Sequence, residues 1–297
     1  MRFVTSGGML RLAVATDAET YERMGDPLAA RDIAVEHVQT RYRTIPLDDP
    51  PWGEFDAGFV FPPRLMEGGV ADAVLDVPWV NDREAILRSR NKGGAIARLS
   101  QAGVPVPETV VVSNPADESD LVDAYDRFDP PVVVKPNSTT RGVGVAKARD
   151  RDSFLGVVDY LDLVHDFQAT GDKSYLIQEF LPGATDYRVM VLDGEYVGAV
   201  ERRLPEDALA AGQWKHNVHR GAEATRVDLD PELRDLAERA AAALDIPFVG
   251  VDLLVTDDRA VVNETNARPT IDDAAKYVDG FWDDLAELIR ETADRER

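Results

Sequence analysis

Short apolar runs between polar turns open the chain. Leu10–Thr16 (LRLAVAT) and Ala57–Phe61 (AGFVF) are nearly all apolar, which is typical of buried strands. The polar turn after the first run leads into Pro27–Glu36, where we expect a helix. A strand, a helix and a second strand in this order predict a small α/β unit with a parallel sheet, which we expect over residues 1–88.

After this unit the pattern changes to strands that pair through hairpins. We expect a helix over Asp82–Gln101, which Gly103 and Pro105 would end. The runs that follow predict strands at Thr109–Ser113, Pro131–Pro136 and Val145–Ala148, and helices at Glu118–Phe128 and Ser153–Leu163. Together these elements predict an α+β lobe over residues 89–173.

A second strand-rich lobe is expected over residues 174–297. Asp193–Gly194 and Asp257–Asp258 each separate two apolar runs, so each predicts a hairpin. Residues 204–226 are polar, and we expect no strong structure there. The other runs predict strands at Ser174–Phe180, Tyr187–Leu192, Tyr196–Glu201, Val249–Val255 and Ala260–Glu264, and helices at Pro231–Leu244 and Ala274–Arg290.

The run that contains Lys135 carries the first candidate for phosphate chemistry. Its neighbours in Val132–Pro136 predict burial, and a buried Lys is costly without an anionic partner. The next loop, Ser138–Gly144, has hydroxyl residues and two glycines, whose backbone N–H groups can approach phosphates. We therefore expect Lys135 to meet a nucleotide phosphate. The alternative is an edge strand whose Lys reaches water.

The segment Gln178-Glu179-Phe180 lies where another buried run ends. Backbone groups at a strand end, beside an aromatic ring, can hold the edge of an adenine. The alternative is an ordinary strand terminus, so this segment supports a nucleotide site only together with Lys135.

Three oxygen-bearing residues give the strongest chemical signal. Asp252 interrupts the apolar run Val249–Leu254, and Glu264 and Asn266 end the run that follows it. Residues two apart on a strand face the same side, and a short hairpin lets the two strands pair. Asp252, Glu264 and Asn266 therefore form a candidate Mg²⁺ site that would share phosphate oxygens. The alternative is a set of surface carboxylates.

Basic residues cluster at two further places. Glu201-Arg202-Arg203 ends a predicted strand, and Lys215–Gly221 lies in the polar segment. Clustered Arg side chains can neutralise a phosphoryl group in transfer or bind a carboxylate, although they also balance charge on acidic surfaces. His216 and His219 are three residues apart without a further candidate ligand, which disfavours a zinc site.

Composition narrows the functional classes. The 297 residues carry a net charge of −22, which disfavours binding to a nucleic-acid backbone. Only six of the 33 basic residues are Lys, and a dispersed, acidic and lysine-poor surface predicts a protein adapted to high salt. The alternative is an ordinary acidic cytosolic enzyme. There is no Cys, no apolar run long enough to span a membrane and no signal-peptide pattern. We therefore expect a cytoplasmic protein without a membrane partner.

In order along the chain, these pieces resemble the ATP-grasp superfamily, and most closely its RimK-type branch of α-L-glutamate ligases. The resemblance covers roughly residues 88–290. It implies an ATP-grasp fold, in which an N-terminal α/β domain precedes two α+β lobes that enclose ATP. The matching runs are Arg90-Asn91-Lys92, Val133-Val134-Lys135, Arg141–Val145, Gln178-Glu179-Phe180, Asp186-Tyr187-Arg188, Glu201-Arg202-Arg203, Asn217–Gly221, Gly250-Val251-Asp252 and Asn263–Asn266.

The resemblance also implies roles for particular residues. Those implied to bind ATP are Lys92, Lys135, Gly142, Gly144, Gln178, Glu179, Phe180, Asp186, Lys215 and Asn217. Asp252, Glu264 and Asn266 would hold two Mg²⁺ ions, for which Mn²⁺ can substitute. Arg203 and Arg220 would stabilise charge at an acyl-phosphate. Three of the six lysines fall on nucleotide positions.

Two departures concern the substrates. Lys215 stands where relatives usually have Arg, so the bidentate hydrogen bonding of a guanidinium is lost there. Ala267-Arg268-Pro269-Thr270 replaces the usual Ser-Pro-Gly-like continuation, and Arg268 adds a positive group beside the metal site. These changes indicate a different pocket for the acceptor or its carboxylate.

The implied activity is that of an ATP- and Mg²⁺-dependent carboxylate–amine ligase, which adds glutamate or a related amino acid to a peptide, protein or coenzyme. Two alternatives stay open, namely a glutathione-synthetase-like ligase that makes a small metabolite and a nucleotide-binding protein without turnover. The donor amino acid, the acceptor and the number of additions are not set by the sequence. The oligomeric state is also open, and a homo-oligomer is one option.

Overall fold

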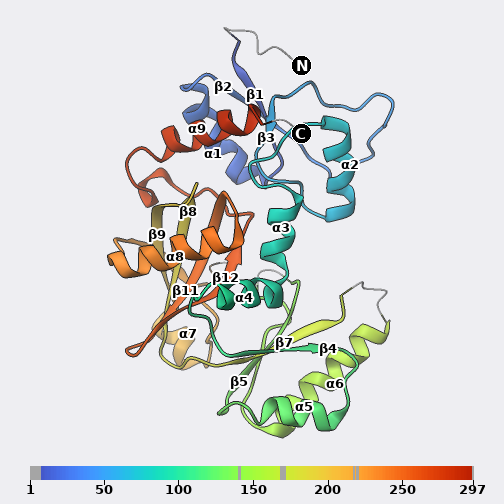
Figure 1. Cartoon of the computed structure of the whole chain (residues 1–297), viewed down its shortest axis with the longest axis vertical. Coiled ribbons are helices and arrows are strands. Elements are labelled where there is room, and N and C mark those ends of the chain that lie inside the picture. The colour runs from blue at the N-terminus through green and yellow to red at the C-terminus, as the bar shows by residue number, and fades with distance from the viewer. Residues whose placement is uncertain (1–7, 140–141, 168–171, 217, 219–220, 296–297) are drawn as a thin grey trace.

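The chain forms three β-sheets that follow one another along its long axis (Figure 1). This arrangement comes from a computed structural model, which describes residues 8–139, 142–167, 172–216, 218 and 221–295. Within these residues no helix combines the length and the apolar character needed to cross a membrane.

The N-terminal unit is a parallel sheet with the strand order β2-β1-β3. Its strands are β1 (Leu10–Val14), β2 (Ile33–His37) and β3 (Ala57–Gly58), and its helices are α1 (Ala18–Ala29) and α2 (Leu65–Leu75). The predicted parallel sheet is confirmed, but the helix expected over Pro27–Glu36 is wrong. The helix starts earlier and buries Thr20, Met24 and Leu28 at four-residue spacing, while 33–37 is a strand.

The central lobe is an antiparallel sheet with the strand order β4-β7-β5-β6. The strands are β4 (Thr109–Ser113), β5 (Val132–Pro136), β6 (Ala146–Ala148) and β7 (Ser174–Glu179). The helices α5 (Glu118–Tyr125) and α6 (Arg151–Phe167) lie on one face of the sheet, as Figure 1 shows. The lobe has a hydrophobic core of its own, which includes Val132, Val134, Tyr175 and Ile177.

The C-terminal sheet has the strand order β10-β9-β8-β11-β12. The strands are β8 (Thr185–Leu192), β9 (Glu195–Arg203), β10 (Glu223–Val227), β11 (Phe248–Val255) and β12 (Ala260–Asn266), and α8 (Pro231–Leu244) packs on one face. Both predicted hairpins are confirmed. Residues 204–226 are more regular than expected, since they contain α7 (Glu206–Ala210) and β10. The edge strand β10 has no fully buried residue, which explains its weak apolar signal.

Two further helical predictions need correction. The stretch 82–101 forms two helices, α3 (Arg83–Arg90) and α4 (Lys92–Gln101), because Asn91 leaves the helical conformation and its side chain caps α4 by accepting a bond from the N–H of Gly94. The last helix, α9 (Phe281–Ala293), begins after Gly280 rather than at Ala274. Ala274–Lys276 is a short 3₁₀ turn.

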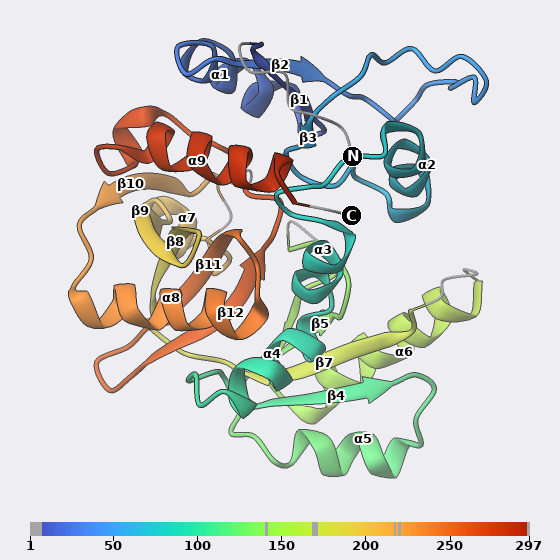
Figure 2. The same cartoon turned by 45° about the horizontal axis from the view of Figure 1, so that its top comes forward.

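The N-terminal unit and the C-terminal lobe share one hydrophobic core, to which Leu12, Phe59, Phe248 and Phe281 all belong. Helix α9 returns from the end of the chain to contact α1 and β3 (Figure 2). The buried Asn81 ties the two parts by polar contacts, since its amide nitrogen donates to the carbonyls of Phe248 at 2.5 Å and Ala267 at 2.7 Å. The domain boundaries at 88 and 173 stay predictions.

We expect Asn81→Leu to lower the free energy of unfolding by about 2–4 kcal/mol, because the polar groups that Asn81 satisfies would stay buried without partners. Urea denaturation would measure the loss. Gln101→Leu at the exposed end of α4 is the control and should change stability by less than about 0.5 kcal/mol. Equal stability of the two variants would contradict the role of Asn81.

Candidate active site

One face of the C-terminal sheet carries charged side chains. Along β11, Val249, Val251 and Leu253 enter the hydrophobic core, so the alternation of the strand turns Asp252 to the opposite face. Strand pairing sets Asp252 opposite Arg188 of β8 and Glu264 of β12. The prediction that Asp252 and Glu264 meet on paired strands is therefore confirmed. Asn266 pairs with Gly250, which brings it to the same face.

A buried ion cluster surrounds Asp252. The guanidinium of Arg188 donates to both carboxylate oxygens of Asp252, at 2.6 and 2.8 Å. Arg202 of β9 lies 3.0 Å from the same carboxylate and donates to Asp186 at 2.5 and 2.9 Å. The side chains of Arg202, Asp186 and Asp252 are nearly excluded from solvent. Each buried charge thus has a partner of opposite sign, as burial requires.

The cluster sets the protonation of its carboxylates. Burial alone would raise the pKa of Asp252, but the charges and hydrogen bonds of Arg188 and Arg202 outweigh burial and hold that pKa below its ordinary value. Burial dominates at Asp186 and raises its pKa to about 6, because Arg202 only partly opposes it and Asp252 adds a negative charge. The two arginines therefore favour the ionised form of Asp252 more strongly than that of Asp186.

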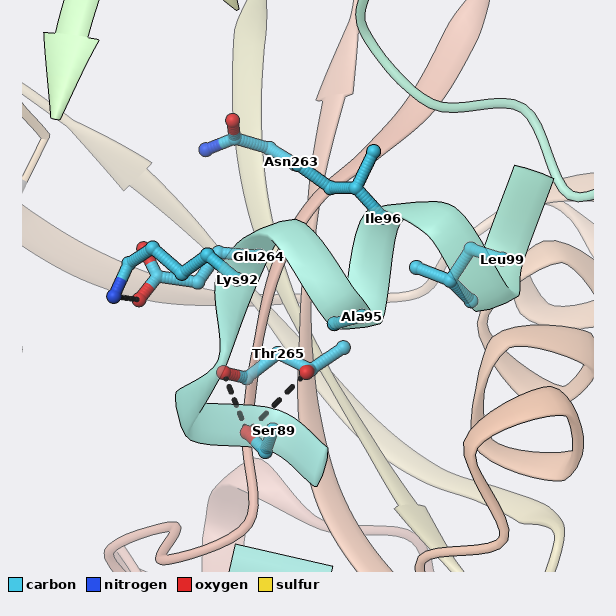
Figure 3. A pocket seen from close by; sticks show the side chains of 8 residues that line it. All are labelled: Ser89, Lys92, Ala95, Ile96, Leu99, Asn263, Glu264 and Thr265. Carbon is cyan, nitrogen blue, oxygen red and sulfur yellow. Dashed lines mark hydrogen bonds and ion pairs between the residues drawn. The ribbon is translucent and has the colours of Figure 1, made fainter. Parts of the chain in front are cut away.

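Two lysines reach this face from elsewhere in the fold. Lys92, at the start of α4, is buried and lies 3.3 Å from the Glu264 carboxylate (Figure 3). Lys135 of β5 is buried too, and its Nζ donates to Gln178 Oε1 at 2.8 Å and lies 3.5 Å from Asn263 Oδ1. Because β5 lies between β7 and β6, the edge-strand alternative for Lys135 is contradicted. Burial lowers the pKa of Lys135 to about 8, although Glu264 opposes that shift.

The loop between β5 and β6 closes over the same region. Gly142 and Gly144 both have positive φ, at 65° and 76°, which side chains rarely adopt. A Cβ on Gly144 would also lie 2.8 Å from the Pro136 ring. The carbonyl of Thr139 in this loop accepts a hydrogen bond from the Lys92 ammonium. The contact with Lys92 therefore holds this loop beside the two buried lysines.

Aromatic side chains lie at the other end of the central sheet. Phe180 follows β7, and its ring meets that of Trp214 edge to face, with the centroids 5.9 Å apart. The Lys147 ammonium lies over both rings, at 4.4 Å from Phe180 and 5.0 Å from Trp214. Lys215 donates to the Val145 carbonyl. Phe180, Trp214 and the two lysines together make an aromatic and cationic cluster beside the end of β7.

The predicted residues do not all converge. Gln178 contacts Lys135, whereas Glu179 is held by Arg259 and by the N–H of Glu108 at 2.7 Å. Arg203 has a 75% exposed side chain that pairs with Glu201, so the structure does not bring it to Asp252. Asn217 and Arg220 lie outside the described residues, as do Arg141 and His219 of the matching runs.

Arg188 and Arg202 are functional residues that the sequence does not single out. Both lie in the matching runs, where the resemblance gives the acyl-phosphate role to Arg203 and none to Arg202. Strand alternation carried the missing signal, because Asp186 and Arg188 are two apart on β8 and Arg202 is directly opposite Asp186. His216 belongs to the same cluster, since its Nδ1 lies 3.7 Å from the Asp186 carboxylate. Within the described part of the chain it does not pair with another histidine.

The oxygen donors on this face suit Mg²⁺. Two carboxylates and an amide, from Asp252, Glu264 and Asn266, are hard ligands that leave positions for water and phosphate oxygens. Asp252 is held deprotonated, the form that binds a metal. Among the described residues no three His, Cys, Asp or Glu side chains lie close enough together to hold a metal ion. Metal binding by Asp252 and Glu264 would therefore also need the Asn266 amide and the oxygens of a bound phosphate.

Residues 89–288 match the family model of the RimK-like ATP-grasp domain. The chain is 32% identical over 199 residues to the ribosomal protein bS6–L-glutamate ligase of Shigella boydii, covering 66% of this chain and 62% of that protein. It is 34% identical over 202 residues to a probable alpha-L-glutamate ligase of Aliivibrio salmonicida, covering 67% and 62%. The chain therefore spans less than two thirds of the length of these relatives.

Solved structures show the same fold over almost the whole chain. A RimK domain ATP-grasp protein from Sphaerobacter thermophilus superposes with a TM-score of 0.66 at 23% identity, covering 95% of this chain and 99% of that one. The D-alanine–D-alanine ligase of Bacillus anthracis complexed with ATP gives 0.67 at 17% identity, covering 96% and 97%. These likenesses confirm the expected ATP-grasp fold.

We expect Arg202→Gln to lower the free energy of unfolding by about 3–5 kcal/mol, because Asp186 would stay buried without its cation. Arg203→Gln removes the same charge one residue away, at an exposed site, and should cost less than about 0.5 kcal/mol. Urea unfolding near neutral pH would compare the two. A smaller loss in Arg202→Gln than in Arg203→Gln would disprove the structural role of the cluster.

Proposed function

The chain belongs to the RimK-like ATP-grasp family, and we propose that it is an ATP- and Mg²⁺-dependent ligase that joins a carboxylate to an amine through an acyl-phosphate. The observation that carries this proposal is the meeting of Lys92 and Lys135 with Glu264 and Asn263, beside Asp252. Buried ammonium groups next to an oxygen-donor set are what a magnesium–triphosphate complex requires. The glutamate-ligase names of the similar proteins favour glutamate, or a related amino acid, as the unit added to a peptide, protein or coenzyme.

In this proposal ATP lies between the central and C-terminal sheets. The adenine would lie along Gln178, Glu179 and Phe180, and the ribose near Asp186. The phosphates would meet Lys92, Lys135 and the loop of Gly142 and Gly144, with Lys215 and Asn217 at the γ-phosphate. The contact between Phe180 and Trp214 supports an aromatic boundary for the base.

The metal set of the proposal is Asp252, Glu264 and Asn266, which would hold two Mg²⁺ ions or Mn²⁺ in their place. When bound, these ions neutralise phosphate charge and align the γ-phosphate for attack. Arg188 and Arg202 keep Asp252 ionised and fix its position on β11.

The proposed reaction has two steps. A substrate carboxylate oxygen attacks the γ-phosphorus, and ADP leaves with the electrons of the broken P–O bond. An amine, as the free base, then attacks the acyl carbon; phosphate leaves, and the amine loses a proton to give the amide. The protein contributes mainly by position and by positive charge, which we assign to Lys92, Lys135 and Arg220, with Arg203 at the rim of the site.

We also propose that the enzyme works in the cytoplasm at high salt. The reaction consumes ATP, and a net charge of −22 with six lysines supports activity in a concentrated salt solution. Assays should therefore be run in molar salt.

Asp252→Asn and Glu264→Gln should each lower phosphate release from Mg-ATP by at least about a hundredfold, because each removes a proposed metal ligand. Release would be measured with a panel of acids and amines, and products would be identified by mass. Asp258→Asn, in the exposed turn between β11 and β12, removes one carboxylate as a control. Wild-type turnover in the first two variants would refute the metal assignment. Phosphate release without amide product would refute ligation.

ATP affinity should fall by about tenfold between pH 7 and pH 9. The pKa of Lys135 is about 8, so this side chain loses its positive charge as the pH rises through that value, and only the charged form attracts a phosphate. Calorimetry with a non-hydrolysable ATP analogue would measure the affinity. Lys135→Met should bind weakly at both pH values, without this dependence. The same pH dependence in Lys135→Met would mean that another group causes it.

A further inference from the structure

A second pocket lies apart from the carboxylate cluster, at the carboxyl ends of β1 and β2. It measures about 180 Å³, and the residues that line it include Thr16, Asp17, His37, Gln39, Thr40 and Arg41. The carboxyl ends of parallel strands are the usual place for ligands in open α/β sheets. A cavity of roughly 150 Å³ can already hold a benzene-sized molecule, so this pocket has room for an amino acid.

Two polar groups of this pocket have no hydrogen-bond partner in the part of the chain that the structure describes. Thr40 is only 5% exposed, and its buried hydroxyl is unpaired among the described residues. The Nε of Arg41, also buried, is unpaired within the same residues. Buried polar atoms left without partners are costly and rare in folded proteins. Both residues line the pocket, and a hydroxyl and a guanidinium N–H are groups that suit a bound carboxylate.

Charges of both signs lie within this pocket. A nitrogen of the Arg41 guanidinium is 3.9 Å from the Asp17 carboxylate, and both residues belong to the lining. A phosphate would be repelled by Asp17, whereas a zwitterion offers a carboxylate to Arg41 and an ammonium to Asp17. The charge pattern therefore favours an amino acid over a simple anion.

Arg268 connects the pocket to the proposed metal site. Its backbone N–H donates to Asn266 Oδ1 at 3.0 Å, while its guanidinium donates to the carbonyls of Ala15 at 2.8 Å and of Phe61. Ala15 lines the pocket. A single arginine side chain therefore spans the distance between the end of β12 and the pocket wall. In the proposed ligase, Arg268 would therefore link a ligand bound there to the metal site.

We infer that this pocket binds the incoming amino acid, L-glutamate, with a free carboxylate on Thr40 and Arg41 and its ammonium toward Asp17. The inference rests on the proposed ligase function and assigns its amine substrate to the N-terminal unit. The carboxylate bound here is one that does not react, because Thr40 and Arg41 would hold it while the amine attacks.

Calorimetric titration of the full chain with L-glutamate, at saturating Mg²⁺ and non-hydrolysable ATP analogue, tests this site. Arg41→Gln should weaken binding by at least about tenfold, and the nearly isosteric Thr40→Val by at least about fivefold. Arg127→Gln removes one exposed Arg on the central lobe, as the matched control, and should bind like the wild type. If Arg41→Gln fails to fold, the loss of L-glutamate binding in Thr40→Val still tests the site.

A second arm separates this inference from the ligase proposal. Hydroxylamine attacks an acyl-phosphate without needing an amino-acid pocket, giving a hydroxamate and phosphate. Arg41→Gln should therefore keep wild-type hydroxamate formation while it loses glutamate-dependent amide formation through a raised KM. Absence of hydroxamate in the wild type would refute the ligase proposal and, with it, the basis of this assignment.

Three results would overturn the assignment while the ligase proposal stands. One is no L-glutamate binding to a wild type that forms hydroxamate. Another is equal binding by the wild type, Thr40→Val and Arg41→Gln. The third is displacement of L-glutamate by inorganic phosphate at equal concentration, which would indicate a general anion site.

Discussion

The site depends on the requirement that buried charges have partners. Asp252 lies on a strand whose other face is part of the main hydrophobic core, and it stays ionised because Arg188 reaches it from the adjacent strand β8 and Arg202 from β9, the strand beyond β8. Neither arginine could be buried alone, and neither could Asp186. The register of β9, β8, β11 and β12 is therefore fixed by hydrophobic residues on one face and by opposite charges on the other.

This constraint extends across the sheets. Lys92 and Lys135 come from α4 and β5, yet their ammonium groups lie near Glu264 and Asn263 of β12. The N-terminal unit is fixed to the same strand by Asn81 and by Arg268. The second half of β12 and the residues just after it thus carry polar contacts to two different parts of the fold. The proposed nucleotide, metal and amino-acid sites would then meet around one strand.

Local sequence patterns predicted the strands and hairpins of the site better than they predicted the contacts between distant parts of the chain. The hairpin around Asp257–Asp258 was enough to pair Asp252 with Glu264, and the apolar neighbours of Lys135 were enough to predict its burial. Alternation along β8 and β9 could have selected Arg202 over Arg203, but strand boundaries read from sequence are too uncertain to fix which face a residue occupies. The pocket at Thr40 could not be predicted, because it forms where separate strand ends meet and no motif marks it.

Isotope transfer from the substrate acid would test the central claim most directly. A carboxylate labelled with ¹⁸O in both oxygens would be incubated with the enzyme, Mg-ATP and the amine, and the released phosphate would be analysed by mass. An acyl-phosphate mechanism predicts that one ¹⁸O appears in each phosphate released, because the carboxylate oxygen that attacks the γ-phosphorus leaves with it. Unlabelled phosphate alongside amide product would contradict the account, since the carboxylate would then have been activated in another way.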